Sequence, residues 1–247
     1  MTFLAWRLWL PVVLCLSWEL TSFAGLSDKL FFPPPSLLIT VAWEMLRTGE
    51  LLRPAGETLW RTLLGFGLGA VAGLLAGVGM GVFAGARKSM EGLLSTLISS
   101  PKISLLPILM LVLGVGDRPR IALIATAAFV VVALQTTDAI RQIAPGFVEM
   151  ARNYGAKGFD MVRWVYLPGS LPQVLSGLRI GLGRALGVCV AVEVVSGNDG
   201  LGHMIWKGWQ TFATERIYIG VLAVAILGGV LHALMKRVEK ALTPWRG

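Results

Sequence analysis

Residues 62–86 read TLLGFGLGAVAGLLAGVGMGVFAGA and contain no charged side chain. This run exceeds the ~20 residues that a helix needs to cross the hydrocarbon core of a bilayer. Glycine recurs every fourth residue, at Gly65, Gly69, Gly73, Gly77, Gly81 and Gly85. Because residues four apart share one helix face, the stripe favours close approach of a second helix, and the alternative use is a face that lines a solute path. We predict a tightly packed transmembrane helix.

Five other apolar runs accompany it, at residues 8–27, 92–116, 121–137, 171–197 and 217–235. Hydrophobic residues make up 55% of the chain and charged residues 15%, which is typical of an integral membrane protein and excludes a soluble enzyme. No run alternates with the two-residue period of a lipid-facing barrel strand. The sequence therefore predicts an all-α membrane protein with six transmembrane helices.

The ends of the chain also bear on this prediction. The first run resembles a secretory signal, but it approaches twenty residues and contains Glu19, so we expect a retained first helix. Lys and Arg are more numerous in the segments that are cytoplasmic if both termini lie inside, and this orientation is predicted. The net charge of +8 has no basic stripe, so no nucleic acid partner is expected.

Two loops are long under this topology. The outer loop, at about residues 28–58, begins with Phe32-Pro33-Pro34-Pro35 and continues as an amphipathic stretch over residues 36–52. The inner loop, at about residues 138–170, predicts a short helix that Pro145 begins and Gly155 ends in a left-handed cap. Its apolar face comprises Phe147, Met150, Ala151 and Tyr154. A second short helix is predicted over residues 159–166, ending before Pro168. Such a platform suits either docking onto a cytoplasmic partner or a position on the membrane surface.

The inner loop resembles the EAA loop of ABC-importer permeases. Its segment has Glu149-Met150-Ala151, three residues, Gly155, nine residues, and Val165-Tyr166-Leu167-Pro168. The family pattern is Glu-Ala-Ala, three residues, Gly, nine residues, Ile-x-Leu-Pro, so this chain departs at Met150 and Val165. Further segments resemble the nitrate/sulfonate/taurine/bicarbonate branch, namely Phe32–Pro35, Leu105–Pro107, Leu113–Gly116, Leu167–Pro172, Gly177–Gly183, Gly200–Gly202 and Leu242–Trp245.

The resemblance implies a type I ABC importer (MetI-like) permease fold. Residues 1–58 would hold the first transmembrane helix and the outer loop, residues 59–237 the transmembrane core with its coupling loop at 141–170, and residues 238–247 a cytoplasmic tail. By position match, Glu149, Ala151, Gly155, Leu167 and Pro168 would form the motif that couples the chain to an ATPase.

The resemblance also implies the partners. Two permease chains, expected to be two copies, would pair with two cytoplasmic ATPase subunits and an extracytoplasmic substrate-binding protein. ATP and Mg²⁺ would bind the ATPase, because this chain has no Gly-x4-Gly-Lys-Ser/Thr loop; the nearest string is Gly85-Ala86-Arg87-Lys88-Ser89. We expect no cofactor and no metal bound by this chain, which is not itself an enzyme.

Charged residues inside the predicted spans are candidates for the solute path. Lys102, Arg184 and Glu193 lie within apolar runs, where ionisable groups are costly and face protein or water. Arg184 and Glu193 lie nine residues apart, on opposite sides of a helix, so each needs a partner elsewhere. Lys102 follows Pro101, and a cation there suits an anionic solute; a structural salt bridge is the alternative. Arg179 is close enough to the inner end of its run to reach water.

These features predict a multi-pass permease in the plasma (inner) membrane, surrounded by lipid, that imports a small anionic solute of the sulfonate, taurine, nitrate or bicarbonate type. The alternative is a secondary carrier or channel that uses the intramembrane charges and needs no ATPase. The EAA spacing and the lack of duplicated halves favour the permease.

Overall fold

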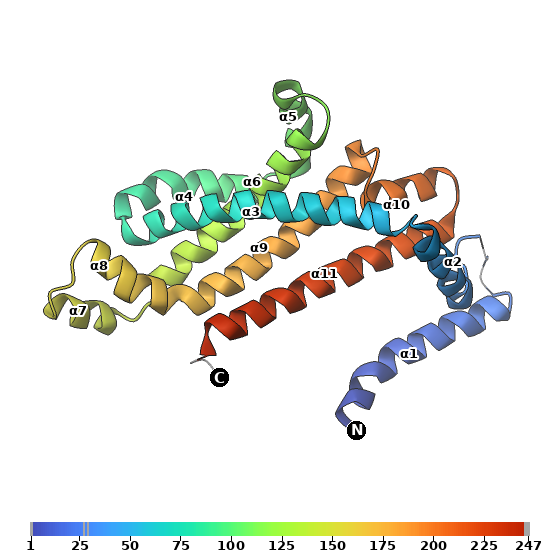
Figure 1. Ribbon diagram of the computed structural model, residues 1–247, viewed down its shortest axis with the longest axis horizontal. Coiled ribbons are helices and arrows are strands. Elements are labelled where there is room, and N and C mark those ends of the chain that lie inside the picture. The colour runs from blue at the N-terminus through green and yellow to red at the C-terminus, as the bar shows by residue number, and fades with distance from the viewer. Residues whose placement is uncertain (1, 27, 29, 245–247) are drawn as a thin grey trace. The chain divides into compact units, whose positions relative to one another are not determined.

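The computed structural model describes residues 2–26, 28 and 30–244, and the side chains from residue 9 onward. Residues 245–247 of the predicted cytoplasmic tail, and Lys29 of the predicted outer loop, lie outside the described residues. The regular structure of the described part is entirely helical (Figure 1). The helices form two compact units, Met1–Glu57 with Glu193–Ile226, and Thr58–Val192 with Leu227–Gly247.

The first unit contains α1 (Thr2–Phe23), α2 (Pro35–Thr48) and α10 (Leu201–Gln210). The predicted amphipathic stretch is therefore helical, but it ends at Gly49, which adopts a left-handed conformation with φ 80°. Glu19 holds α1 against the start of α2, because its carboxylate accepts hydrogen bonds from the backbone N–H and the hydroxyl of Ser36, at 3.1 and 2.7 Å. The carboxylate of this acidic residue in an apolar helix thus has its hydrogen-bond donors in the neighbouring helix.

The same unit includes the first half of α11 (Thr214–Leu242), which binds the segment that follows α1. The Thr214 hydroxyl donates to the carbonyl of Leu30, and the Tyr218 hydroxyl donates to the carbonyl of Phe31 at 3.0 Å. The rings of Trp18 and Tyr218 lie 5.3 Å apart between centroids. These contacts fix the segment that begins the proline-rich turn.

The second unit is built around α6 (Asp117–Arg141), which is more deeply buried than the other long apolar helices. The glycine stripe of α3 (Leu52–Val82) packs on it, as the first of the two readings predicts. A Cβ atom on Gly65, Gly69, Gly73, Gly77 or Gly81 would overlap with α6, at Ile124, Ala128, Val132, Thr136 and Ile140 respectively. From each glycine to the next, the contacted residue of α6 also advances by four, so α3 and α6 run parallel.

The sixth glycine of the stripe does not join this interface. The helix breaks at Phe83, and Gly85 belongs to the next helix, α4 (Ala84–Ser99), where a Cβ would meet nothing within 4 Å. The prediction for Gly85 was therefore wrong, because the four-residue spacing continues in the sequence after the helix axis has changed direction.

α9 (Leu167–Ser196) packs on α6 with small residues as well. A Cβ on Gly177 would lie 2.6 Å from the Cβ of Gln135, and one on Gly181 would lie 2.8 Å from Val132 Cγ2. Ala185 is buried against Ile124 and Ala128. Positions later in α9 thus meet positions earlier in α6, so these two helices are antiparallel.

The predicted span at residues 92–116 is bent rather than straight. It consists of α4, a short 3₁₀ helix η1 (Lys102–Leu105) and α5 (Leu106–Leu113), with a bend of 101° at the break before Lys102. Pro101 lies in this break, where its missing N–H and its ring prevent a continuous helix. Leu94 packs near Val130 and Leu106 near Leu123, so the pair returns along α6.

Within the described residues, three helices are long and apolar enough to cross a membrane, namely α3, α6 and α11. The bent pair is a fourth candidate if it is one broken span. The apolar part of α1, Trp9–Phe23, is shorter. All six predicted runs are thus helical, while length and composition support three to four of them as spans.

Candidate functional site

The loop between α6 and α9 forms a short helix and a sharp turn. α7 (Pro145–Asn153) begins at Pro145, whose fixed φ suits the first position of a helix. Gly155 has φ 89° and ends the helix, as predicted. The Ala156 N–H donates to the Ala151 carbonyl at 3.0 Å, and the Gly155 N–H donates to the Arg152 carbonyl at 2.9 Å. This pair of hydrogen bonds is the Schellman motif, so the local sequence defines the turn.

The second short helix differs from the prediction. α8 (Phe159–Met161) is followed by a π-helical segment, η2 (Val162–Tyr166), and α9 begins directly at Leu167. The prediction that a helix ends before Pro168 was wrong. Proline is tolerated in the first turn of α9, because the N–H that it lacks would have no intrahelical acceptor there. The Ser170 hydroxyl donates to the Tyr166 carbonyl at 2.6 Å and helps to satisfy the backbone at this junction.

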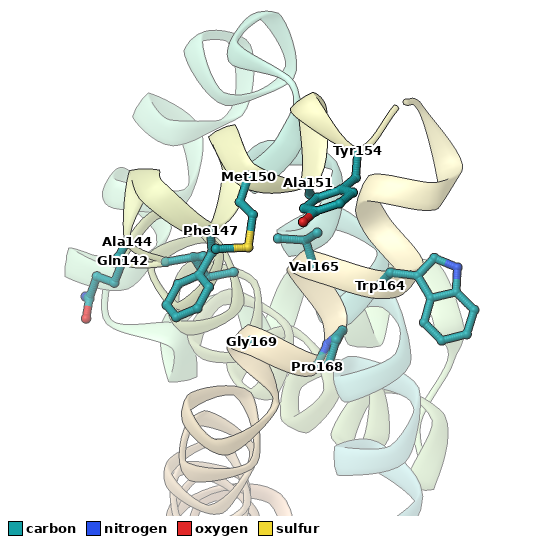
Figure 2. A pocket seen from close by; sticks show the side chains of 11 residues that line it. Gln142, Ala144, Phe147, Met150, Ala151, Tyr154, Trp164, Val165, Pro168 and Gly169 are labelled. Carbon is teal, nitrogen blue, oxygen red and sulfur yellow. The ribbon is translucent and has the colours of Figure 1, made fainter. Parts of the chain in front are cut away.

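Together, α7 and the start of α9 enclose an apolar cavity of about 560 Å³ (Figure 2). Phe147, Met150 and Ala151 line it from α7 and Tyr154 from the C-cap of this helix, so the predicted apolar face points into the cavity. The remaining lining residues come from either side of the platform, namely Gln142, Ile143, Ala144, Trp164, Val165, Pro168 and Gly169. Sequence reasoning did not identify Trp164 as part of the site; its place beside Val165 of the motif was the available signal.

The cavity is open at its edge, and the three aromatic side chains there are largely exposed to solvent. Tyr154 is 88% exposed, Trp164 67% and Phe147 64%. A group of large apolar side chains on one exposed surface is typical of an interaction site. The surface formed by these residues is called the aromatic rim.

The five motif residues have different places in this arrangement. Ala151 and Pro168 line the cavity, whereas Gly155 shapes the turn and Leu167 is 48% exposed at the start of α9. Glu149 does not line the cavity; together with Asn153 it lines a neighbouring pocket that shares Met150 and Tyr154 with the cavity. It is the fifth residue of α7 and is not in its first turn, so it does not complement the N-terminus of its own helix.

Charged side chains surround the platform. Arg141, Arg152, Lys157 and Arg163 alternate along the loop with Glu149 and Asp160, all of them exposed. The Arg163 guanidinium lies 5.1 Å from the centroid of the Trp164 ring, within the range of a cation–π contact. At the base, the Gln173 side-chain amide donates to the Gln142 side chain at 3.0 Å and joins α9 to the end of α6.

The predicted solute-path residues separate into two groups. Lys102 begins η1 at the break in the bent span, and Arg184 lies on α9 one turn before Val188, which packs against the cluster of Leu106, Leu123 and Val192. Glu193 is fully buried, and its carboxylate accepts a hydrogen bond from the Gly202 N–H at 3.1 Å, at the start of α10. Arg179 forms an ion pair with Glu239 at 2.6 Å, in place of the predicted reach to water.

A buried charge cluster was not predicted. Arg61 on α3 is 2% exposed and its Nε lies 2.7 Å from Oδ1 of Asp117, which also lies 3.3 Å from Nη1 of Arg120. Asp117 is in the first turn of α6, where a negative charge is favourable. Because buried charges require partners, this cluster holds the start of α6 against α3.

The described residues contain no group of three or more His, Cys, Asp and Glu side chains placed to hold a metal ion. The chemistry that the loop offers is recognition by apolar contact and surface charge.

The structure thus combines a helical core with a helix–turn platform between two antiparallel apolar helices, α6 and α9. The binding-protein-dependent transport system inner membrane component family matches residues 69–245, and the chain belongs to this family.

Curated relatives match over nearly the whole chain. The putative aliphatic sulfonates transport permease protein SsuC of Escherichia coli (strain K12) is 28% identical, with 96% of this chain and 90% of the relative covered. The taurine transport system permease protein TauC of the same organism is 30% identical, with 96% and 88% covered. The SsuC protein of Bacillus subtilis (strain 168) is also 30% identical, with 96% and 86% covered.

Solved structures share the fold. The MetNI methionine ABC transporter in an inward-facing conformation has a chain that is 25% identical, with a TM-score of 0.72 and coverage of 78% of this chain and 96% of that chain. The chain is thus an ABC transporter permease subunit with a type I importer fold, and its relatives are transport components of the membrane.

Proposed function

We propose that this chain is the membrane subunit of an importer for a small anionic solute of the sulfonate, taurine, nitrate or bicarbonate type, and that a separate cytoplasmic ATPase drives it through α7. The observation that carries the proposal is the α7 platform, with its apolar cavity and exposed aromatic rim, at the motif positions Ala151 and Pro168. Relatives named for aliphatic sulfonates and taurine support the solute class.

The platform suits mechanical coupling because it is short and firmly held. The Schellman turn at Gly155 fixes one end of α7, and Pro145 fixes the other. The hydrogen bond between Gln173 and Gln142 links the platform to both α6 and α9. A force applied to α7 would therefore be transmitted to two apolar helices at once, while Glu149 remains available for a basic group of the ATPase.

We further propose six membrane crossings with both termini in the cytoplasm. The parallel packing of α3 on α6 supports this count, because the chain between them must return along the full length of α6. α4, η1 and α5 provide that return and would form one broken span, whereas a re-entrant loop would leave α3 and α6 antiparallel. Two copies of the chain, two ATPase subunits and a binding protein would complete the transporter.

Gly155→Asp tests the coupling role. Gly155 has φ 89°, which strains any residue with a Cβ, but a Cβ there would meet nothing within 4 Å, so we expect the variant still to insert in the membrane. The added carboxylate would alter the docking surface. We expect transport-linked ATP hydrolysis of the reconstituted complex to fall by about tenfold or more, which corresponds to about 1.4 kcal/mol of lost interaction.

Gly146→Asp is the matched control. It adds the same charge to the same helix in open space, near the N-terminus, where an acidic residue is favourable. We expect this variant to hydrolyse ATP and transport solute at the wild-type rate. Normal stimulated hydrolysis by Gly155→Asp, or full transport by the purified chain without any ATPase, would contradict the proposed function.

A further inference from the structure

Two positive charges meet beside the break in the span formed by α4, η1 and α5. Lys102 begins η1 directly after Pro101, and its Nζ donates to the carbonyls of Leu97 and Ile98, at 3.1 and 3.4 Å. These carbonyls belong to the last turn of α4, where backbone acceptors lack intrahelical donors. The lysine therefore stays at the break with its charge held in place by backbone oxygens.

Arg184 approaches the break from α9. Packing places it there, because Leu106 after the break and Val192 of α9 belong to one buried cluster, and Val188, one turn beyond Arg184, packs against that cluster. Both cations thus lie beside the same cluster, formed by Leu106, Leu123 and Val192, and their like charges repel each other. Neither side chain forms an ion pair with a carboxylate in the part of the chain that the structure describes.

The surface around Arg184 is unusually open. Gly183 and Gly187 flank it on the exposed side of α9, and a Cβ on either glycine would meet nothing within 4 Å. A small molecule can therefore reach the guanidinium without displacing a side chain. Arg179, one turn and a half away on the same helix, differs in this respect because Glu239 already neutralises it.

The hydrogen-bond donors of Lys102 and Arg184 that have no acceptor among the described residues define the kind of ligand that would bind. An ammonium group has three donors, and the two backbone carbonyls leave one for a ligand. A guanidinium has a planar fork of donors that matches two oxygens of an oxyanion. Unpaired like charges within apolar segments are costly, and an anion between them would relieve that cost.

We propose that Lys102 and Arg184 together form an oxyanion-binding site on the solute path, which receives the charged end of a small organic anion such as an alkyl sulfonate. The assignment of the site to transport rests on the proposed function, whereas anion binding itself does not. The alternative is that both cations serve structure alone, Lys102 as a cap of α4 and Arg184 as an interface residue.

The test uses the purified full chain in lipid nanodiscs, with unfolding followed by tryptophan fluorescence. Methanesulfonate is the probe, and dimethyl sulfone is its uncharged isostere. We expect methanesulfonate to raise Tm and dimethyl sulfone at the same concentration and ionic strength to leave it unchanged, because a ligand stabilises the state that binds it. Lys102→Met and Arg184→Met should each weaken the apparent affinity at least tenfold.

Two controls separate a binding role from a structural one. Lys88→Met removes an exposed cation from α4 and should keep the wild-type response. Without ligand, Arg184→Met should unfold at the wild-type temperature or above it, because the repulsion has been removed. An equal response to both probes, an unchanged response in Arg184→Met, or a lower Tm of ligand-free Arg184→Met would overturn the proposal.

Uptake of methanesulfonate by the complete complex with its ATPase and binding protein distinguishes the two proposals. A wild-type complex that transports while Lys102→Met and Arg184→Met transport equally well would refute the anion site and leave the importer function intact. A chain that binds the anion in nanodiscs but supports no ATP-driven uptake would refute the importer function and leave the site intact. We expect uptake by the wild type and its loss in both variants.

Discussion

Three glutamates, Glu19, Glu57 and Glu193, stabilise helix starts that lack side-chain caps of their own. Glu19 accepts hydrogen bonds from Ser36 in the first turn of α2. Glu57 accepts from the Gly200 N–H at 3.0 Å, and Glu193 accepts from the Gly202 N–H at 3.1 Å, at the start of α10. The free N–H groups of a helix start carry partial positive charge, so a remote carboxylate can replace a local cap. This explains why acidic residues are tolerated in apolar stretches.

Gly200→Ala should therefore destabilise the first unit. Gly200 has φ 91°, which strains any residue with a Cβ, and the new methyl group would overlap with the Glu193 carboxylate. We expect a loss of about 2 kcal/mol or more in the free energy of unfolding, since backbone strain alone costs about 1–3 kcal/mol. Gly187→Ala is the control, because it adds a methyl group in open space inside a helix and should be neutral or slightly stabilising. Equal stability of Gly200→Ala and the wild type would contradict a role of this close contact with Glu193 in stabilising the start of α10.

At the scale of elements, the interface between α3 and α6 depends on the absence of side chains. Five glycines of α3 place its backbone directly against α6, which contributes larger residues such as Ile124, Val132 and Thr136. The Thr137 hydroxyl donates to the Gly77 carbonyl at 3.3 Å across this contact. In lipid, apolar side chains gain little from leaving the solvent, so close packing and hydrogen bonds of this kind hold helices together.

Gly69→Ala and Gly67→Ala form a matched pair that tests this interface. A Cβ on Gly69 would overlap with the Ala125 carbonyl and lie 2.9 Å from the Cβ of Ala128, whereas one on Gly67 would meet nothing within 4 Å. We expect Gly69→Ala to lower stability by about 1–3 kcal/mol, as overpacking does. Gly67→Ala should match or exceed wild-type stability. Unfolding in detergent measures both, and equal effects of the two substitutions would show that the stripe is not a packing surface.

At the scale of the whole molecule, the function requires the α7 platform and the α10 region to lie on opposite sides of the membrane. The positive charges along the chain favour a cytoplasmic platform, and the six crossings that we propose include one by α9 between the two segments. An importer that receives solute outside and ATP-driven force inside needs this polarity.

Cysteine labelling checks the polarity directly. Tyr154 and Lys207 are both exposed, and the two native cysteines, Cys15 and Cys189, can be replaced by alanine first. We expect a membrane-impermeant maleimide to label Lys207→Cys in intact cells and to label Tyr154→Cys only after the membrane is permeabilised. Labelling of both from one side would mean that α9 does not cross, and labelling of Tyr154→Cys from outside would exclude docking on a cytoplasmic ATPase.

Much of this architecture was predictable because it is encoded by neighbours in sequence. The apolar runs predict helices, Pro145 and Gly155 delimit α7, and the four-residue glycine spacing predicts the packed face of α3. The spacing from Glu149 to Pro168 indicates the family to which the chain belongs. Each of these signals depends on periodicity, on a backbone preference or on a fixed separation along the chain.

The remaining features depend on residues that are distant in sequence. The sequence alone did not predict the Asp117 cluster with Arg61, the pairing of Arg179 with Glu239, or the burial of Glu193 against Gly202. It also could not show that the helices of Lys102 and Arg184 pack around one cluster, or that the glycine stripe ends before Gly85. A buried charge takes its partner from whichever helix packs beside it, so long-range packing alone decides these contacts, whereas helix formation and turn geometry depend on the local chain.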